Sequence, residues 1–161
     1  MKVPATVAAI ITTDQPIEVL MLPVMVAGPG AERRARQTRS VDLLVGHKLE
    51  YVRLGHAVVL SFTGGRQVLI ETVAHLDSRH GRVDIEPGEH PSDALATLLG
   101  DVVRTARARD TGELELTFGS GATLLVGVDP DFESWAVTGP GNVLMVCLAR
   151  GELAVWDPAA R

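Results

Sequence analysis

The sequence predicts an α+β fold that consists mainly of antiparallel strands, in two tandem helix–three-strand meander units that pack as a sandwich or a partly open barrel. Three observations support this prediction. Apolar and polar residues alternate with a period of two, as in half-buried strands. Glycine-rich turns separate these segments at short intervals. The whole pattern occurs twice along the chain, and self-similarity of this kind indicates a repeated structural unit.

The first unit is predicted over residues 41–90. A short helix is expected before Gly46. The strands that follow it are interrupted at Gly64 and Gly65, and Gly65 matches Gly121 in the hairpin turn of the second unit. Residues 72–86 predict a further pair of strands around a polar turn.

The second unit is predicted over residues 91–157. Residues 91–99 are expected to form a short helix, because Pro91 lies near its first turn and Gly100 directly follows it. Strict alternation over residues 113–118 indicates a strand with one apolar face. Further strands are predicted over residues 102–108, 122–128, 143–148 and 152–156. Matching positions in the two units are Gly46 and Gly100, Arg53 and Arg107, Leu60 and Leu116, Phe62 and Phe118, and Gly65 and Gly121.

Residues 1–40 are expected to lie outside a β-rich domain that spans residues 41–157, as an extra strand or a loosely attached extension. Residues 28–30 read Gly-Pro-Gly, which breaks regular structure. The apolar runs at residues 3–11 and 17–27 are shorter than the roughly 20 residues that a membrane-spanning helix needs. Neither a membrane segment nor a cleaved secretion signal is therefore predicted, and the expected location is the cytoplasm.

The composition restricts the classes of partner and site. Of the 161 residues 46% are hydrophobic, which suits a single domain with its own core. The net charge is −5, and nucleic acid is not an expected partner because domains that bind it usually carry a basic face. An acidic surface favours a basic protein partner instead. Cys147 is the single cysteine and the histidines show no ligand spacing, so no disulfide, metal or cofactor is predicted.

A specific pattern of aromatic and acidic residues occupies the C-terminal part of the chain. Residues 132–135 read Phe-Glu-Ser-Trp, Cys147 lies in an apolar run, and residues 151–156 read Gly-Glu-Leu-Ala-Val-Trp. This pattern resembles an uncharacterised bacterial family, a domain of unknown function with an aromatic-Glu-Ala-Trp motif, a cysteine and a final Gly-Gly-Glu-Leu-Ala-Val-Trp. The resemblance covers residues 41–157 and implies no established activity. Ala149-Arg150 stands where the family tends to have Pro-Gly, so a different turn is expected there.

Acidic residues cluster in and around this motif. Asp129, Asp131 and Glu133, joined by Glu152, have the oxygen ligands that a hard cation prefers, and paired carboxylates also serve as general acid and base. In the other interpretation, Asp129 begins a turn and the neighbouring carboxylates cap backbone N–H groups.

The two tryptophans, Trp135 and Trp156, each lie close to a glutamate in the sequence. A half-exposed tryptophan with a neighbouring carboxylate is typical of an interface hot spot. Tryptophans also fill an aromatic-poor core, with the indole N–H bonded to a nearby acceptor. At least one of the two is expected in the core.

The expected function is therefore that of a non-enzymatic protein-binding module, in a specific form an immunity- or antitoxin-like protein that neutralises a basic effector by surface complementarity. Two alternatives are a metal-dependent or acid–base hydrolase that uses Asp129, Asp131 and Glu133, and a structural subunit that self-associates through its sheet edges. The expected binding surface consists of Asp131, Glu133, Trp135, Glu152 and Trp156.

Overall fold

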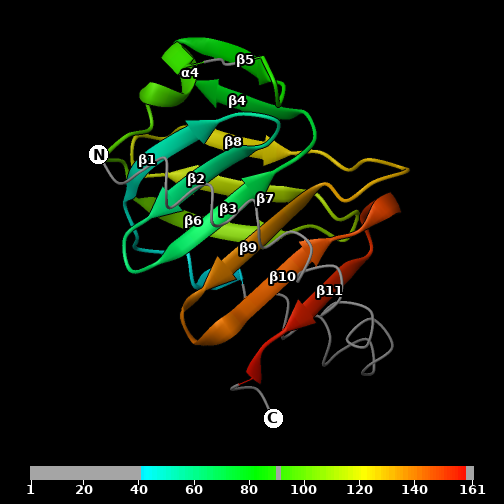
Figure 1. The fold of residues 1–161 in the computed structure, drawn as a ribbon. Helices are drawn as coiled ribbons and strands as arrows, with labels where there is room; N and C mark the ends of the chain where they lie inside the picture. Colours follow the sequence, from blue (N-terminus) through cyan, green and yellow to red (C-terminus); the bar gives the residue numbers. More distant parts are fainter. Residues whose placement is uncertain (1–40, 90–91, 159–161) are drawn as a thin grey trace.

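Two antiparallel sheets pack face to face in the protein, as a computed structural model shows (Figure 1). The structure describes residues 41–89 and 92–158. The predicted N-terminal extension, residues 1–40, and the predicted helix start at Pro91 lie outside the described residues. Within the described residues, neither sheet closes into a barrel, and no helix has the length and apolar character needed to cross a membrane.

The larger sheet has six strands in the order β1-β2-β3-β9-β10-β11. Its strands are β1 Leu49–Leu54, β2 Val58–Phe62, β3 Arg66–Ile70, β9 Trp135–Gly139, β10 Val143–Cys147 and β11 Leu153–Trp156. In Figure 1 the orange and red strands β9 to β11 continue the sheet that the teal and green strands β1 to β3 begin. Two short 3₁₀ turns, η1 Pro140–Asn142 and η2 Ala149–Gly151, connect β9 to β10 and β10 to β11.

The smaller sheet has five strands in the order β5-β4-β8-β7-β6. Its strands are β4 Ala74–Ser78, β5 Gly81–Ile85, β6 Val103–Ala108, β7 Leu114–Phe118 and β8 Thr123–Val126. The one α-helix labelled among the described residues, α4 Ser92–Ala96, precedes β6. The antiparallel β character predicted from the alternation is thus confirmed.

The finer prediction of two helix–three-strand units is not supported, for two reasons. Before Gly46 the described chain has helical conformation only at Val41 and Asp42, and a turn follows. The two sheets also do not correspond to the two predicted units, since β9 to β11 pair with the first meander and β4 and β5 with the second. Alternation identifies the face of a strand that is buried, but it does not identify the strand's neighbours.

Strand β9 is the element that periodicity does not predict. Its residues Trp135, Ala136 and Val137 are all buried, so no polar residue alternates with them. The strand is central in its sheet, pairing with β3 on one side and with β10 on the other. A strand that is covered on both faces loses the period-two signal that marks a half-buried strand.

The first residues of β1 and β6 form matching contacts between the sheets. The N–H of Gly46 donates to the carbonyl of Val103 at 2.8 Å, and the N–H of Gly100 donates to the carbonyl of Leu49 at 2.8 Å. Both strands have a register irregularity directly after these positions. The four residues therefore tie the two sheets together at one end. The internal repeat of residues 41–90 and 91–157 remains a prediction.

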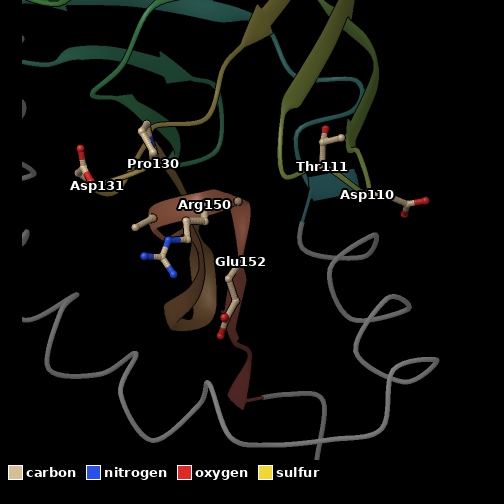
Figure 2. A pocket seen from close by; sticks show the side chains of 8 residues that line it. Asp110, Thr111, Pro130, Asp131, Arg150 and Glu152 are labelled. Atoms are coloured by element: carbon tan, nitrogen blue, oxygen red, sulfur yellow. The ribbon is translucent and has the colours of Figure 1, made fainter.

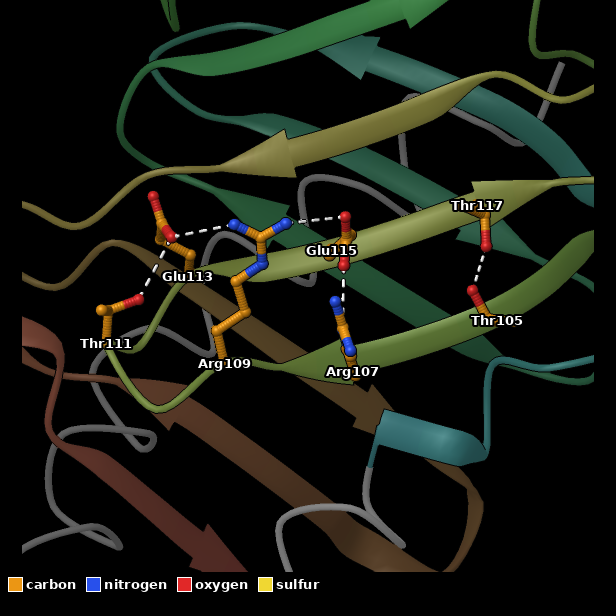
Figure 3. A network of polar contacts seen from close by, with 7 residues as sticks. All are labelled: Thr105, Arg107, Arg109, Thr111, Glu113, Glu115 and Thr117. Atoms are coloured by element: carbon orange, nitrogen blue, oxygen red, sulfur yellow. Dashed lines mark hydrogen bonds and ion pairs between the residues drawn. The ribbon is translucent and has the colours of Figure 1, made fainter.

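The main core lies between the sheets, and the two outer faces differ from each other. Trp135, Phe62 and Phe118 are the largest fully buried side chains of the core. A second apolar cluster lies on the outer face of the six-stranded sheet. On the five-stranded sheet, a network of charged residues and threonines extends over β6 and β7 (Figure 3).

Candidate functional site

An open groove of about 610 Å³ lies where three connections meet at one end of the sandwich (Figure 2). The connections are the β6–β7 turn, the β8–β9 loop and η2 with the residue that follows it. The residues that line the groove are Asp110, Thr111, Pro130, Asp131, Ala149, Arg150, Gly151 and Glu152. These residues come from widely separated parts of the chain, so the tertiary fold brings them together.

Two glycines allow the β6–β7 turn and η2 to approach each other closely. A Cβ atom on Gly112 would lie 2.5 Å from the Cα of Gly151, and one on Gly151 would overlap with the carbonyl oxygen of Thr111. Both glycines also have positive φ angles, 101° and 87°, which side-chain-bearing residues rarely adopt. The two backbones are therefore in direct contact beside the groove, and no residue with a side chain fits at either position.

Trp135 supports this backbone contact from the core. Its indole N–H donates to the carbonyl of Gly112 at 2.9 Å, and the Sγ of Cys147 donates to the same oxygen at 3.4 Å. Trp135 is 0% exposed. Its assignment to the binding surface therefore needs correction, because its side chain has no accessible area and acts as a core residue with a bonded N–H. The core interpretation of one tryptophan fits this placement.

Cys147 is buried next to Trp135 and is a thiol at neutral pH. Burial in the apolar core raises the pKa of Cys147 to about 11. Since the thiolate is the nucleophilic form, this side chain is an inert part of the core.

Asp129 organises the β8–β9 loop. Its Oδ1 accepts hydrogen bonds from the N–H groups of Asp131 and Phe132 at 2.7 and 3.1 Å. Its own N–H donates to the Oγ of Ser134 at 2.7 Å, and its carbonyl accepts from the N–H of Arg150 at 2.9 Å. This is the turn-capping arrangement of an aspartate at the start of a loop. A carboxylate used in this way argues against the hydrolase alternative, which needs Asp129 for catalysis.

Phe132 is the functional candidate that sequence reasoning missed. It follows the capped residue Asp131 in the loop and is 72% exposed, the highest value among the exposed large hydrophobic residues. Its N–H is fixed by Asp129, so the backbone that carries the ring is held in place. The turn at Asp129 could have indicated this exposure, because residues at the tip of such a turn lie on the surface.

Arg150 is the one basic residue among those that line the groove. Its φ angle is 67°, in the left-handed region that favours glycine. In Figure 2 its guanidinium lies between the side chains of Asp131 and Glu152. The chain therefore has a cation in a strained backbone position within an otherwise acidic groove, and this is the turn where a departure from the family pattern was expected.

The remaining predicted site residues are split between two places. Asp131 and Glu152 both line the groove, and Glu133 is half-buried in the loop beside it. Trp156 ends β11, where it pairs with Leu144 on the outer apolar face of the sheet. The predicted five-residue surface is therefore not one patch, because Glu152 precedes β11 and Trp156 ends it.

No group of three or more His, Cys, Asp or Glu side chains is arranged to hold a metal ion in the part of the chain that the structure describes. His75 is paired with Asp84, with 2.7 Å between Nδ1 and Oδ1, on the outer face of the five-stranded sheet. The Nδ1 of His47 lies 3.0 Å from the hydroxyl of Thr63. These two histidines therefore take part in pairwise contacts on separate elements.

A family model described as a family of unknown function (DUF6188) matches residues 40–157. No curated protein and no solved structure matches the chain. The matched region contains both sheets, the groove and the C-terminal motif with Trp135, Cys147 and Trp156. On this evidence the chain belongs to the DUF6188 family of unknown function.

Proposed function

We propose that the protein is a small protein-binding module and that the groove, together with Phe132, is the surface that receives its partner. The observation that carries this proposal is the exposed Phe132 ring on a backbone fixed by Asp129, next to the groove. Immobilising an aromatic ring on binding costs little conformational entropy. Aromatic residues also contribute much of the binding free energy at protein interfaces. Because its loop is already ordered by hydrogen bonds, binding would not have to pay for ordering it.

Charge around the groove favours a basic partner. Asp110, Asp131 and Glu152 contribute three carboxylates, and Arg150 contributes one cation. A basic peptide segment or loop would find complementary charge on the rim while the aromatic ring supplies apolar contact. Arg150 would select for a partner that also presents an acidic group, because an unmatched buried cation would weaken binding.

The specific form of this proposal is an immunity- or antitoxin-like protein that neutralises a basic effector in the bacterial cytoplasm. The net charge of −5 supports it, since opposite charges accelerate association. The matching glycine positions of the two units support the further idea that the chain arose by internal duplication. Neither idea is needed for the groove to act as a binding surface.

The test is retention of a partner by the full-length immobilised chain from a lysate of the source bacterium. Any retained protein is identified by mass spectrometry, produced separately and titrated by calorimetry against three chains. These are the wild type, Phe132→Ala with Asp131→Lys, and the matched control Val83→Ala with Glu86→Lys. The control removes an exposed apolar side chain and reverses one charge on β5 and its following loop.

We expect the groove variant to lose at least about 30-fold in affinity, the size of a hot-spot effect, and the control to lose less than about threefold. Thermal melting of all three chains shows that they are folded. Equal affinity of wild type and groove variant for the purified partner would refute the proposed surface. Binding of a small molecule or turnover of a substrate in the groove, with no protein partner retained, would refute the function.

A further inference from the structure

We propose that the edge strand β5 pairs antiparallel with β5 of a second copy of the chain, with Val83 opposite Val83 of that copy on a two-fold axis. The pairing joins the five-stranded sheets of the two copies into one continuous sheet. It concerns a different surface from the groove and does not depend on the proposed function. It rests on the exposure of this edge, on the direction of its main-chain groups and on the order of its charges.

Strand β5 is an edge strand with an exposed outer side. In the five-stranded sheet it pairs with β4 alone (Figure 1). The side chains of Arg82 and Asp84 are 56% and 65% exposed. Val83 is 37% exposed, although it pairs with the buried Leu76 on the core side of the sheet. Among the described residues, no other segment forms backbone hydrogen bonds along β5, and an edge of this kind is a template for a further strand.

The main-chain groups at the second and fourth positions of β5 point away from the sheet. The N–H of Gly127, directly after β8, donates to the carbonyl of Val73, directly before β4, at 3.1 Å. Because the main-chain groups of a strand alternate between its two neighbours, those of Ala74 and of every second residue after it face β5. Ile85 is paired with Ala74, so its groups face β4, and those of the second and fourth residues of β5 face outward.

The order of charges along β5 is complementary to an antiparallel copy of itself. With Val83 on the axis, Arg82 lies opposite Asp84 of the second copy, and Asp84 lies opposite Arg82 of that copy. Both pairs are hydrogen-bonded pairs, since their main-chain groups face outward, and both join opposite charges. A shift by two residues would instead place two arginines or two aspartates opposite each other. The charges therefore select this register, which has the two-fold symmetry that is commonest in homo-oligomers.

Strand β4 continues this alternation of charge on the outer face of the sheet. The Nε of Arg82 lies 3.9 Å from the Oδ1 of Asp77, and the Nδ1 of His75 lies 2.7 Å from the Oδ1 of Asp84. Each row across the proposed seam therefore begins with Asp77 and Arg82 and continues with Asp84 and His75 of the second copy. Each Arg82 then lies between two carboxylates, and a network of this kind contributes more than an isolated exposed ion pair.

The opposite edge strand of the same sheet, β6, lacks these properties. Its pairing with β7 has a register irregularity between Val103 and Thr105, and such bulges protect an edge against further pairing. Its exposed charged residues, Arg104 and Arg107, are both basic, and Arg107 is bonded to Glu115. Two copies of β6 would therefore bring together like charges, and of the two edges of this sheet β5 is the one suited to self-pairing.

The first test measures the mass of the full-length chain by sedimentation equilibrium, from about 10 µM to about 1 mM. A five-residue strand forms an interface smaller than the roughly 1,200 Å² of a standard complex, so we expect a dimer with a dissociation constant of the order of 100 µM.

A cysteine on the two-fold axis provides a covalent readout. Residues opposite each other in a non-hydrogen-bonded pair have Cα atoms about 4.5 Å apart, which is within the range of a disulfide. Val83→Cys should therefore link two copies on mild oxidation. The matched control, Arg104→Cys on β6, should stay a single chain, and Cys147 does not interfere because it is buried.

Reversal of charge tests the register. Arg82→Asp and Asp84→Arg should each be monomeric over the whole concentration range, because like charges then face each other across the seam. An equimolar mixture of these two variants should form the dimer again, since every aspartate meets an arginine. The control Arg104→Asp, which reverses an exposed charge on β6, should dimerise as the wild type does. Thermal melts establish that each variant is folded, and the cysteine readout needs no change of charge.

The groove and this edge can be tested separately. The control chain of the groove titration, Val83→Ala with Glu86→Lys, changes the edge and no residue that lines the groove. It should bind a partner of the groove as the wild type does, while its self-association weakens.

Any of three results would overturn the inference. One is the mass of a single chain at about 1 mM, which would leave the edge to a strand of another protein. Another is a dimer that persists in both charge-reversal variants, or a Val83→Cys protein that forms no link. The third is a mixture of the two folded charge-reversal variants that stays monomeric.

Discussion

The outer faces of the two sheets follow the same period-two geometry but have opposite chemistry. On the six-stranded sheet, the row from Val59 to Ala154 is apolar and buried. On the five-stranded sheet, the outward side chains of β6 and β7 are polar and bond to one another (Figure 3). The comparison teaches that one face of an antiparallel sheet can be exposed to water when its outward side chains are polar and form hydrogen bonds.

The polar face is organised around Glu115. Its two carboxylate oxygens accept hydrogen bonds from Arg107 at 2.9 Å and from Arg109 at 2.8 Å. Arg109 also lies 3.5 Å from Glu113, and the hydroxyls of Thr105 and Thr117 share a hydrogen bond. Burial by itself raises the pKa of Glu115, but the hydrogen bonds and charges of the two arginines outweigh it and lower the pKa below its ordinary value of 4.5. The hydrogen bond to Glu115 and its charge likewise raise the pKa of Arg109.

The largest expected effect tests the difference between the two outer faces directly. Val146→Asn places an amide on the apolar face, and we expect a loss of about 3–4 kcal/mol in the free energy of unfolding from lost apolar burial and an unsatisfied polar group. Leu125→Asn makes a similar change at a half-buried outward position of β8, opposite Glu115, where we expect a loss below about 1 kcal/mol. Urea denaturation of both variants measures the difference. Equal losses would show that the two outer faces do not differ energetically.

A second prediction separates the inner and outer surfaces of the six-stranded sheet. Trp135→Phe removes the N–H that bonds to Gly112 and leaves a small cavity, and we expect it to cost about 2 kcal/mol. Trp156→Phe, at the half-buried end of β11, should cost less than about 1 kcal/mol. Thermal melts of the two single variants provide the measurement. A larger loss at Trp156 would contradict the assignment of Trp135 as the anchor of the groove.

A third prediction concerns the polar face and its dependence on pH. Because the pKa of Glu115 is lower in the folded protein than in the unfolded chain, its ionisation stabilises the fold above the unfolded value, and this stability is lost as the pH falls through the folded value. Glu115→Gln should therefore cost about 1 kcal/mol at pH 7 and progressively less below pH 4.5. Unfolding curves from pH 7 to pH 3 measure this. A difference between the two proteins that stays constant with pH would contradict it.

The smallest expected effect is at Arg150. Glycine relieves the left-handed strain at a φ of 67° but increases the entropy of the unfolded chain, so we expect Arg150→Gly to gain about 0.5 kcal/mol in stability. Affinity for a partner of the groove should change more than stability does, because the groove loses its one lining cation. A denaturation midpoint below that of the wild type would show that the side chain of Arg150 contributes more to the fold than its backbone strain costs.

Local pattern was sufficient to predict most strands and one loop. The alternation in residues 113–118 predicted a strand with Leu114, Leu116 and Phe118 inward, and these three are buried in β7. The turn chemistry of Asp129 and Pro130 predicted an Asx turn, and Asp129 caps the loop in this way. In both cases the information lies within a few residues, because side-chain alternation and turn hydrogen bonds are short-range properties.

Tertiary structure alone decided which strands are neighbours and where the motif residues lie. Strand β9 carries no alternation because both of its faces are buried, and its pairing with β3 joins segments about 70 residues apart in the chain. That pairing places Trp135 in the core under Gly112 and leaves Phe132 exposed. Trp135 and Phe132 are both aromatic residues of one short motif, and only long-range packing places one in the core and the other on the surface. Strand pairing over this distance is not encoded in the local residue pattern.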